Sequence, residues 1–219
     1  MQWLLTLKQY LDPEFILRTA GEYALPVLIL IIFAETGLMA GFFLPGDSLL
    51  FVTGFFCGME YIPHSIWTIL FCLTVAAIVG DQTGYLIGKK LGKALFNKPR
   101  SLFFNPAHVV KAKAFYDKHG GKAIILGRFV PIVRTFVPTI AGVAQMEYKT
   151  FVSYNVVGGF AWIFSMTLLG YLPVAYMPRE VVTSTIKPAV PLITLTIIVL
   201  SALPMVLTGV REYMAKRRR

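Results

Sequence analysis

Long uncharged apolar runs dominate the chain and predict membrane-spanning helices. Residues 61–80, 150–178 and 188–210 carry no charged side chain and are 20, 29 and 23 residues long. About 20 apolar residues are enough for a helix to cross the ~30 Å hydrocarbon core of a bilayer. We therefore predict transmembrane helices over 61–88, 150–172 and 188–210.

Two further apolar segments are poorly suited to simple crossings. Residues 23–59 carry only Glu35 and Asp47 as charges, and residues 123–146 carry only two arginines. Glycines and prolines interrupt both segments, and non-helical backbone is tolerated at membrane depth only where it is buried in protein or lines a wet cavity. Each segment therefore predicts a re-entrant helical hairpin. The residues expected to break the helices of these hairpins are Pro45, Gly46, Pro131 and Pro138.

The two broken segments resemble each other. GFFLP at 41–45 and GRFVP at 127–131 share Gly, Phe and Pro at an offset of 86 residues, and a predicted spanning helix follows each hairpin. We expect a first repeat over 23–92 and a second over 123–178. Broken segments in corresponding halves of a chain point to a transport site near the bilayer midplane.

Composition and charge support a membrane protein and set its orientation. The chain of 219 residues is 56% hydrophobic and 15% charged, with a mean hydropathy of +0.67, which argues against an ordinary soluble domain. The net charge of +10 is concentrated at 89–122 and 216–219. The positive-inside rule therefore places the loop 93–122 and the tail 211–219 in the cytoplasm, where anionic lipid headgroups, rather than nucleic acid, are the expected partners.

This orientation makes the two repeats inverted. If 93–122 is cytoplasmic, the second hairpin enters from the cytoplasm and the first from the opposite face. The sequence thus predicts an all-α integral membrane protein of two inverted repeats, each a re-entrant hairpin plus a transmembrane helix, with a C-terminal transmembrane helix. An amphipathic interfacial helix is expected over 1–22, and the side of the N-terminus stays open.

Arg128 and Arg134 are the first candidates for function. A charge near the bilayer centre is disfavoured by roughly 2.5–3.5 kcal/mol on insertion scales, so its presence needs a reason. The planar guanidinium donates two hydrogen bonds to phosphate oxygens and stays ionised when desolvated. With Thr135 and exposed helix N–H groups, the arginines would form a lipid-phosphate cradle. The alternative is that they extend to the interface, which is easier for Arg128, six residues beyond Lys122.

Glu35 and Asp47 are the acidic counterparts of these arginines. The protonation of a carboxyl group depends on its burial and on neighbouring charges, so a carboxylate that alternates between water and an arginine can couple transport to protons. The alternative is static ion pairs that only hold the hairpins together. We expect both acids and both arginines to face one polar cavity.

The remaining polar positions carry weaker signals. Asp81, Asn155 and Trp162 are possible secondary site residues, although structural roles are the simpler interpretation, with Asp81 capping or pairing locally. Gly80, Gly84, Gly88 and Gly92 recur at GxxxG spacing, which favours close helix packing. The sequence has no metal-ligand spacing and no nucleophile–base pair beside the arginines, so we expect no metal, no cofactor and no catalytic residues.

Two stretches resemble the bacterial DedA family of inner-membrane proteins, which are related to eukaryotic lipid scramblases. They are FAETGLMAGFFLPGDSLL at 33–50 and HGGKAIILGRFVPIVRTFVPTIAGVAQM at 119–146. The resemblance implies two facing re-entrant hairpins and recycling of undecaprenyl phosphate across the membrane, driven by the proton motive force. It also implies that the matching acids and arginines are important for function: Glu35, Asp47, Arg128 and Arg134.

The resulting hypothesis is a proton-coupled translocase of a polyprenyl phosphate lipid in the inner membrane, not an enzyme. A membrane lipid phosphatase and a proton or cation pathway without a lipid substrate are the alternatives. The sequence leaves open the lipid, the direction of transport and whether the protein forms an oligomer.

Overall fold

The computed structural model describes residues 13–38, 44–96 and 120–200, and every regular element in them is helical. The all-α prediction is therefore confirmed for the described residues. The elements, in chain order, are α2 (Pro13–Ala20), η1 (Gly21–Tyr23), α3 (Ala24–Gly37), α4 (Gly46–Gly58), α5 (Ile66–Phe96), α7 (Lys122–Gly127), α8 (Pro131–Val143), α9 (Tyr148–Tyr176), α10 (Arg179–Val181) and the π-helical turn η3 (Val182–Ile186).

Four helical stretches of the described chain are long and apolar enough to cross a membrane: Pro13–Gly37, Ile66–Leu91, Tyr148–Tyr176 and Arg179–Leu200. The last three contain or overlap the predicted transmembrane helices, and they start or end several residues beyond the uncharged runs. The reason is that charged and polar residues can form the first or last turns of a helix, so a helix can extend beyond the uncharged run. The C-terminal helix, for example, begins at Arg179.

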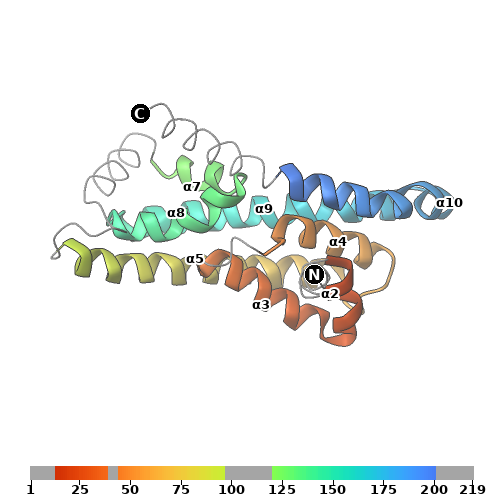
Figure 1. Cartoon of the computed structure of the whole chain (residues 1–219), viewed down its shortest axis with the longest axis horizontal. Helices are drawn as coiled ribbons and strands as arrows, with labels where there is room; N and C mark the ends of the chain where they lie inside the picture. The colour runs from red at the N-terminus through yellow and green to blue at the C-terminus, as the bar shows by residue number, and fades with distance from the viewer. Residues whose placement is uncertain (1–12, 39–43, 97–119, 201–219) are drawn as a thin grey trace, which may run out of the picture.

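The N-terminal part of the described chain bends. Gly21 has a φ of 52°, a conformation that residues with a side chain rarely adopt. In Figure 1, α2 accordingly does not continue in line with α3. Of the amphipathic helix predicted over 1–22, residues 13–20 form α2, and residues 1–12 lie outside the described chain.

The helices α4 and α8 are too short to cross a bilayer. Each has 13 residues and is about 20 Å long at ~1.5 Å per residue, against a ~30 Å hydrocarbon core. Helix α4 follows Pro45, and α8 starts with Pro131 after the extended Val130, a favourable position for proline at a helix start. The re-entrant path of both hairpins stays a prediction, and the tip of the first, residues 39–43, lies outside the described chain.

One expected helix break is wrong. Pro138 was predicted to interrupt the second hairpin, but α8 continues through it to Val143. A proline inside a helix removes one backbone hydrogen bond, here the bond that would reach the carbonyl of Arg134. Neighbouring helices can compensate for such a loss inside a membrane protein, and α8 packs along α5. The break lies at residues 128–130, between α7 and α8.

The long helices α5 and α9 organise the molecule. In Figure 1 both run along its long axis, with α4 and α8 displaced toward opposite ends. Helix α4 packs on α9, α8 packs on α5, and α3 packs on α5. Each short helix therefore lies mainly against the long helix of the other predicted repeat.

Glycines mark both of these helix crossings in the same way. A Cβ on Gly54 of α4 would collide with the backbone of Thr167 in α9, and a Cβ on Gly170 of α9 would collide with Phe51 in α4. At the other crossing, Gly88 of α5 meets Thr139 of α8, and Gly142 of α8 meets Tyr85 of α5. In every case the contacted carbonyl lies three residues before the partner glycine. The predicted close packing at the α5 glycines is therefore confirmed at Gly88.

Apolar side chains form both the core and the outer surface. Leu28, Ile32, Leu49, Leu50, Ile69, Leu70 and Leu73 are fully buried between α3, α4 and α5. The outward positions are also apolar, as at Trp67 and Phe71 on α5 and Phe160 on α9, which are 70%, 70% and 51% exposed. Lipid chains are the natural environment for such a surface, whereas the buried charges lie inside the protein.

Candidate functional site

Arg134 is the centre of a buried charged cluster. It lies in the first turn of α8 and is 4% exposed. Its Nη1 donates to Asp47 Oδ1 at 2.6 Å, and its Nη2 donates to Glu35 Oε1. The guanidinium therefore uses separate nitrogens to bind carboxylates from α3 and α4.

The local sequence of each helix explains how the two carboxylates reach Arg134. Glu35 lies near the end of α3, and Asp47 is the second residue of α4. Gly46 makes this approach possible, since a Cβ at that position would collide with the Glu35 carboxylate. The cluster forms where the end of α3 and the beginnings of α4 and α8 meet.

Trp162 of α9 completes the cluster around Arg134. Its indole Nε1 donates to Asp47 Oδ1 at 2.7 Å, and the Arg134 guanidinium carbon lies 4.2 Å from the centre of its ring. Trp162 is fully buried. Residues from α3, α4, α8 and α9 thus contribute to one polar site.

Arg128 forms a second buried group. It lies in the turn after α7, and its Nη2 donates to Asp81 of α5 and to Asn155 of α9. Asn155 also donates from Nδ2 to the Ile78 carbonyl at 3.3 Å. The Arg128 side chain lies against Gly158, where a Cβ would come within 2.9 Å of its Cδ, and it passes Gly159 at an ordinary contact distance.

The geometry corrects two expectations from the sequence. Arg128 does not join Glu35 and Asp47 in the described contacts, because Asp81 is its carboxylate partner. Asp81 in turn pairs with an arginine 47 positions away rather than locally. Thr135 is buried next to Arg134, and its part in binding a ligand stays a prediction.

The sequence did not predict that Asp81 and Asn155 are the partners of Arg128, nor that Trp162 contacts Arg134 and Asp47. On α9 the buried residues recur at helical spacing, and Asn155 and Trp162 lie on this same buried face, seven residues or about two turns apart. This spacing was the available signal that one helix supplies a side chain to each arginine.

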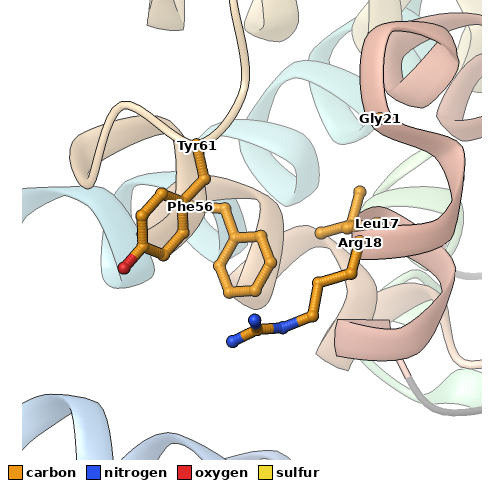
Figure 2. A pocket seen from close by; sticks show the side chains of 5 residues that line it. All are labelled: Leu17, Arg18, Gly21, Phe56 and Tyr61. Atoms are coloured by element: carbon orange, nitrogen blue, oxygen red, sulfur yellow. The ribbon is translucent and has the colours of Figure 1, made fainter.

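A cavity of about 340 Å³ lies apart from these charges, and its lining residues differ from those of both clusters. Leu17 and Arg18 of α2 form one side, Phe56 of α4 and Tyr61 form the other, and Gly21 completes it (Figure 2). Arg18 is 61% exposed, pairs with Glu14 at 3.8 Å and lies over the Phe56 ring, so this cavity holds no buried charge. We therefore place the candidate site at the buried charges instead.

The fold and the buried charges define a class: a multi-pass helical membrane protein with ion pairs inside its helix bundle. Comparison with known proteins gives the family. The VTT domain model matches residues 44–172, more than half of the chain. The chain therefore belongs to the DedA family of VTT-domain membrane proteins, as the sequence motifs predicted.

Relatives extend the match over nearly the whole chain. The protein DedA of Escherichia coli is 42% identical over 198 residues, which cover 90% of this chain and 87% of DedA. An uncharacterized membrane protein of Mycobacterium tuberculosis is 41% identical over 94% of this chain and 89% of its own length. The inner membrane protein YqjA of Escherichia coli is 39% identical over 67% of this chain and 66% of its own length. No solved structure matches the chain significantly.

These relatives indicate where the protein is located in the cell. Together with four candidate transmembrane helices, they make this chain a multi-pass protein of the bacterial inner membrane. The names of the Mycobacterium tuberculosis protein and of YqjA describe membrane proteins, and none of the three names gives an enzymatic activity.

Proposed function

We propose that this protein translocates a polyprenyl phosphate lipid, with undecaprenyl phosphate as the expected substrate, across the inner membrane in a proton-dependent manner. The observation that carries the proposal is Arg134, a buried guanidinium in the first turn of α8 that is held by Asp47 from the first turn of α4 and by Glu35 from the last turn of α3. The phosphate would bind there while the lipid tail stays in the bilayer.

The position of Arg134 suits a phosphate. Helix N-termini carry partial positive charge and unpaired N–H groups, so they favour anions. Arg134 lies in the first turn of α8 and contacts the first turn of α4 through Asp47. Its two terminal nitrogens, which now bind two different carboxylates, have the spacing that a phosphate group can bridge.

Charge balance provides the argument for protons. The cluster of Glu35, Asp47 and Arg134 has one more carboxylate than guanidinium. A phosphate monoester adds about −1.5 to −2 charge at neutral pH, and like charges repel strongly in a site shielded from water. The phosphate can therefore replace the carboxylates on Arg134 only if they take up protons or move away. Proton uptake by Glu35 or Asp47 would couple phosphate entry to the proton gradient.

Arg128 has a supporting place in this scheme. Its ion pair with Asp81 is neutral overall, and Asn155 holds the same nitrogen. We propose that the Arg128 guanidinium forms the positive end of this ion pair beside the phosphate path, and that Thr135 supplies a hydroxyl beside Arg134. Anionic headgroups at the cytoplasmic surface are the proposed partners of the basic loop and tail.

A vesicle assay separates this proposal from its alternatives. The purified protein is reconstituted with a fluorescent polyprenyl phosphate, and the accessibility of the headgroup, the released inorganic phosphate and the proton flux without lipid are measured in parallel. We expect headgroup movement without phosphate release. Release of phosphate would identify a lipid phosphatase, and proton flux without lipid movement would identify a proton pathway.

A further inference from the structure

Trp162 touches both kinds of charge in the Arg134 cluster. Its N–H donates to Asp47 Oδ1 at 2.7 Å, the same oxygen that accepts from Arg134 Nη1 at 2.6 Å. Its ring faces the Arg134 guanidinium at 4.2 Å, a distance at which a cation is attracted to the electron-rich face of an indole. A packing role alone requires neither contact.

The two contacts act on different states of the site. The N–H stabilises Asp47 when it is an ionised carboxylate, because a donor favours the charged form of an acceptor. The ring face stabilises the guanidinium without supplying a negative charge. If a phosphate displaces the carboxylates from Arg134, the indole contact is retained.

Helix α9 holds Trp162 in place while a phosphate replaces the carboxylates on Arg134. Trp162 is fully buried in a 29-residue helix, whereas Glu35, Asp47 and Arg134 lie near the ends of shorter helices. The groups that face Asp47 include Glu35 from α3, Arg134 from α8 and Trp162 from α9. Trp162 is the neutral member of this set.

We propose that Trp162 is a positioning residue, which aligns the Asp47 carboxylate with Arg134 and holds the guanidinium in place when phosphate replaces the carboxylates. The inference rests on the proposed function. It adds a residue that acts through Asp47 and Arg134 rather than by binding the phosphate itself.

The first test compares Trp162→Phe with Trp67→Phe as the matched control. Phe keeps an aromatic ring but has no N–H donor, and Trp67 is exposed on the outer surface of α5. We expect Trp162→Phe to lower translocation by roughly tenfold, the order expected for a lost hydrogen bond to a charged group. We also expect its pH profile to change, because the hydrogen bond from the indole N–H to Asp47 Oδ1 is lost. Trp67→Phe should match the unaltered protein in both respects.

The second test uses the natural Trp162 and does not depend on that variant folding. The chain has three tryptophans, so Trp3→Phe combined with Trp67→Phe leaves Trp162 as the single reporter. We expect the emission of Trp162 to change when the purified protein is titrated toward acid pH, and we expect Asp47→Asn to abolish that change. Glu60→Gln is the control, because Glu60 is exposed and its partner is Arg179.

The outcomes decide the inference separately from the proposed function. A well-folded Trp162→Phe with normal rate and an unshifted pH profile would overturn it, as would an emission titration that persists in Asp47→Asn. If lipid translocation is absent but the emission change depends on Asp47, the proposed function fails, whereas the alignment of Asp47 by Trp162 is supported.

Discussion

At the scale of single residues, the two arginines are held in different ways. Arg134 uses two nitrogens to bind two carboxylates, whereas Arg128 directs one nitrogen to both Asp81 and Asn155. A lysine ammonium can replace a single nitrogen better than it can replace a planar fork. The two positions should therefore respond differently to the same substitution.

We predict that Arg134→Lys lowers translocation by at least about tenfold, while Arg128→Lys retains activity within about threefold. The assay is headgroup accessibility in vesicles with equal amounts of each variant, after thermal unfolding has shown comparable folding. Equal losses in both variants would contradict the distinction, and near-normal activity in Arg134→Lys would remove the phosphate-binding role.

The four charged residues and the carboxylate partners of Arg134 could be predicted from the sequence, whereas the partners of Arg128 could not. Arg128, Arg134, Glu35 and Asp47 are visible because a charge in an apolar segment is costly. The pairing of Arg128 with Asp81 depends on how α5 and α7 both pack against α9, which no local pattern reports. Trp162 was harder to identify, since the sequence around an aromatic residue in an apolar helix looks the same whether the residue only packs or also contacts a charged group.

At the scale of helices, glycine contacts set the distance between the short and long helices. The α5–α8 crossing places Gly88 against the backbone of Thr139, five residues after Arg134. Gly84 lies one turn earlier on the same helix, and a Cβ there would come no closer than 3.3 Å to Pro138. The two glycines therefore form a matched pair for testing the crossing.

We predict that Gly88→Ala destabilises the protein by about 1–3 kcal/mol, because an inserted methyl group must push two backbones apart. Gly84→Ala should stay within about 0.5 kcal/mol of the unaltered protein or gain stability from its better helix propensity. Thermal unfolding in one detergent compares the variants. A Gly88→Ala protein as stable as Gly84→Ala would show that the crossing tolerates separation.

The helices also show what sequence patterns can determine. The long uncharged runs predicted α5 and α9, because 20 or more apolar residues leave few alternatives. The break at Pro138 was wrong, since packing against α5 outweighs one lost hydrogen bond. The start of the C-terminal helix at Arg179 was missed, because the pattern of uncharged residues begins only at Pro188.

At the scale of the whole molecule, the path of the first hairpin decides the architecture. Residues 13–37 are long and apolar enough to cross the membrane, whereas the sequence predicts a hairpin that turns within it. In the crossing arrangement, Leu38 reaches the cytoplasmic face. In the re-entrant arrangement, it stays at membrane depth.

We predict that Leu38→Cys, in a protein with Cys57 and Cys72 replaced by Ala, is not labelled by a membrane-impermeant maleimide from the cytoplasmic face. Tyr61→Cys, placed after α4, should be labelled from the opposite face and serves as the accessible control. Inverted membrane vesicles and intact spheroplasts expose the two faces. Labelling of Leu38→Cys from the cytoplasmic side would contradict the re-entrant hairpin and support a full crossing by residues 13–37.

The most direct test of the whole account measures polyprenyl phosphate translocation under an imposed pH gradient. Vesicles contain the unaltered protein, Glu35→Gln or Asp47→Asn, and each is compared with and without the gradient. The account predicts that the gradient accelerates the unaltered protein and that the response is lost in both variants. The reason is that a Gln or Asn amide beside Arg134 cannot take up and release a proton. A gradient response that is equal in all three proteins would contradict it.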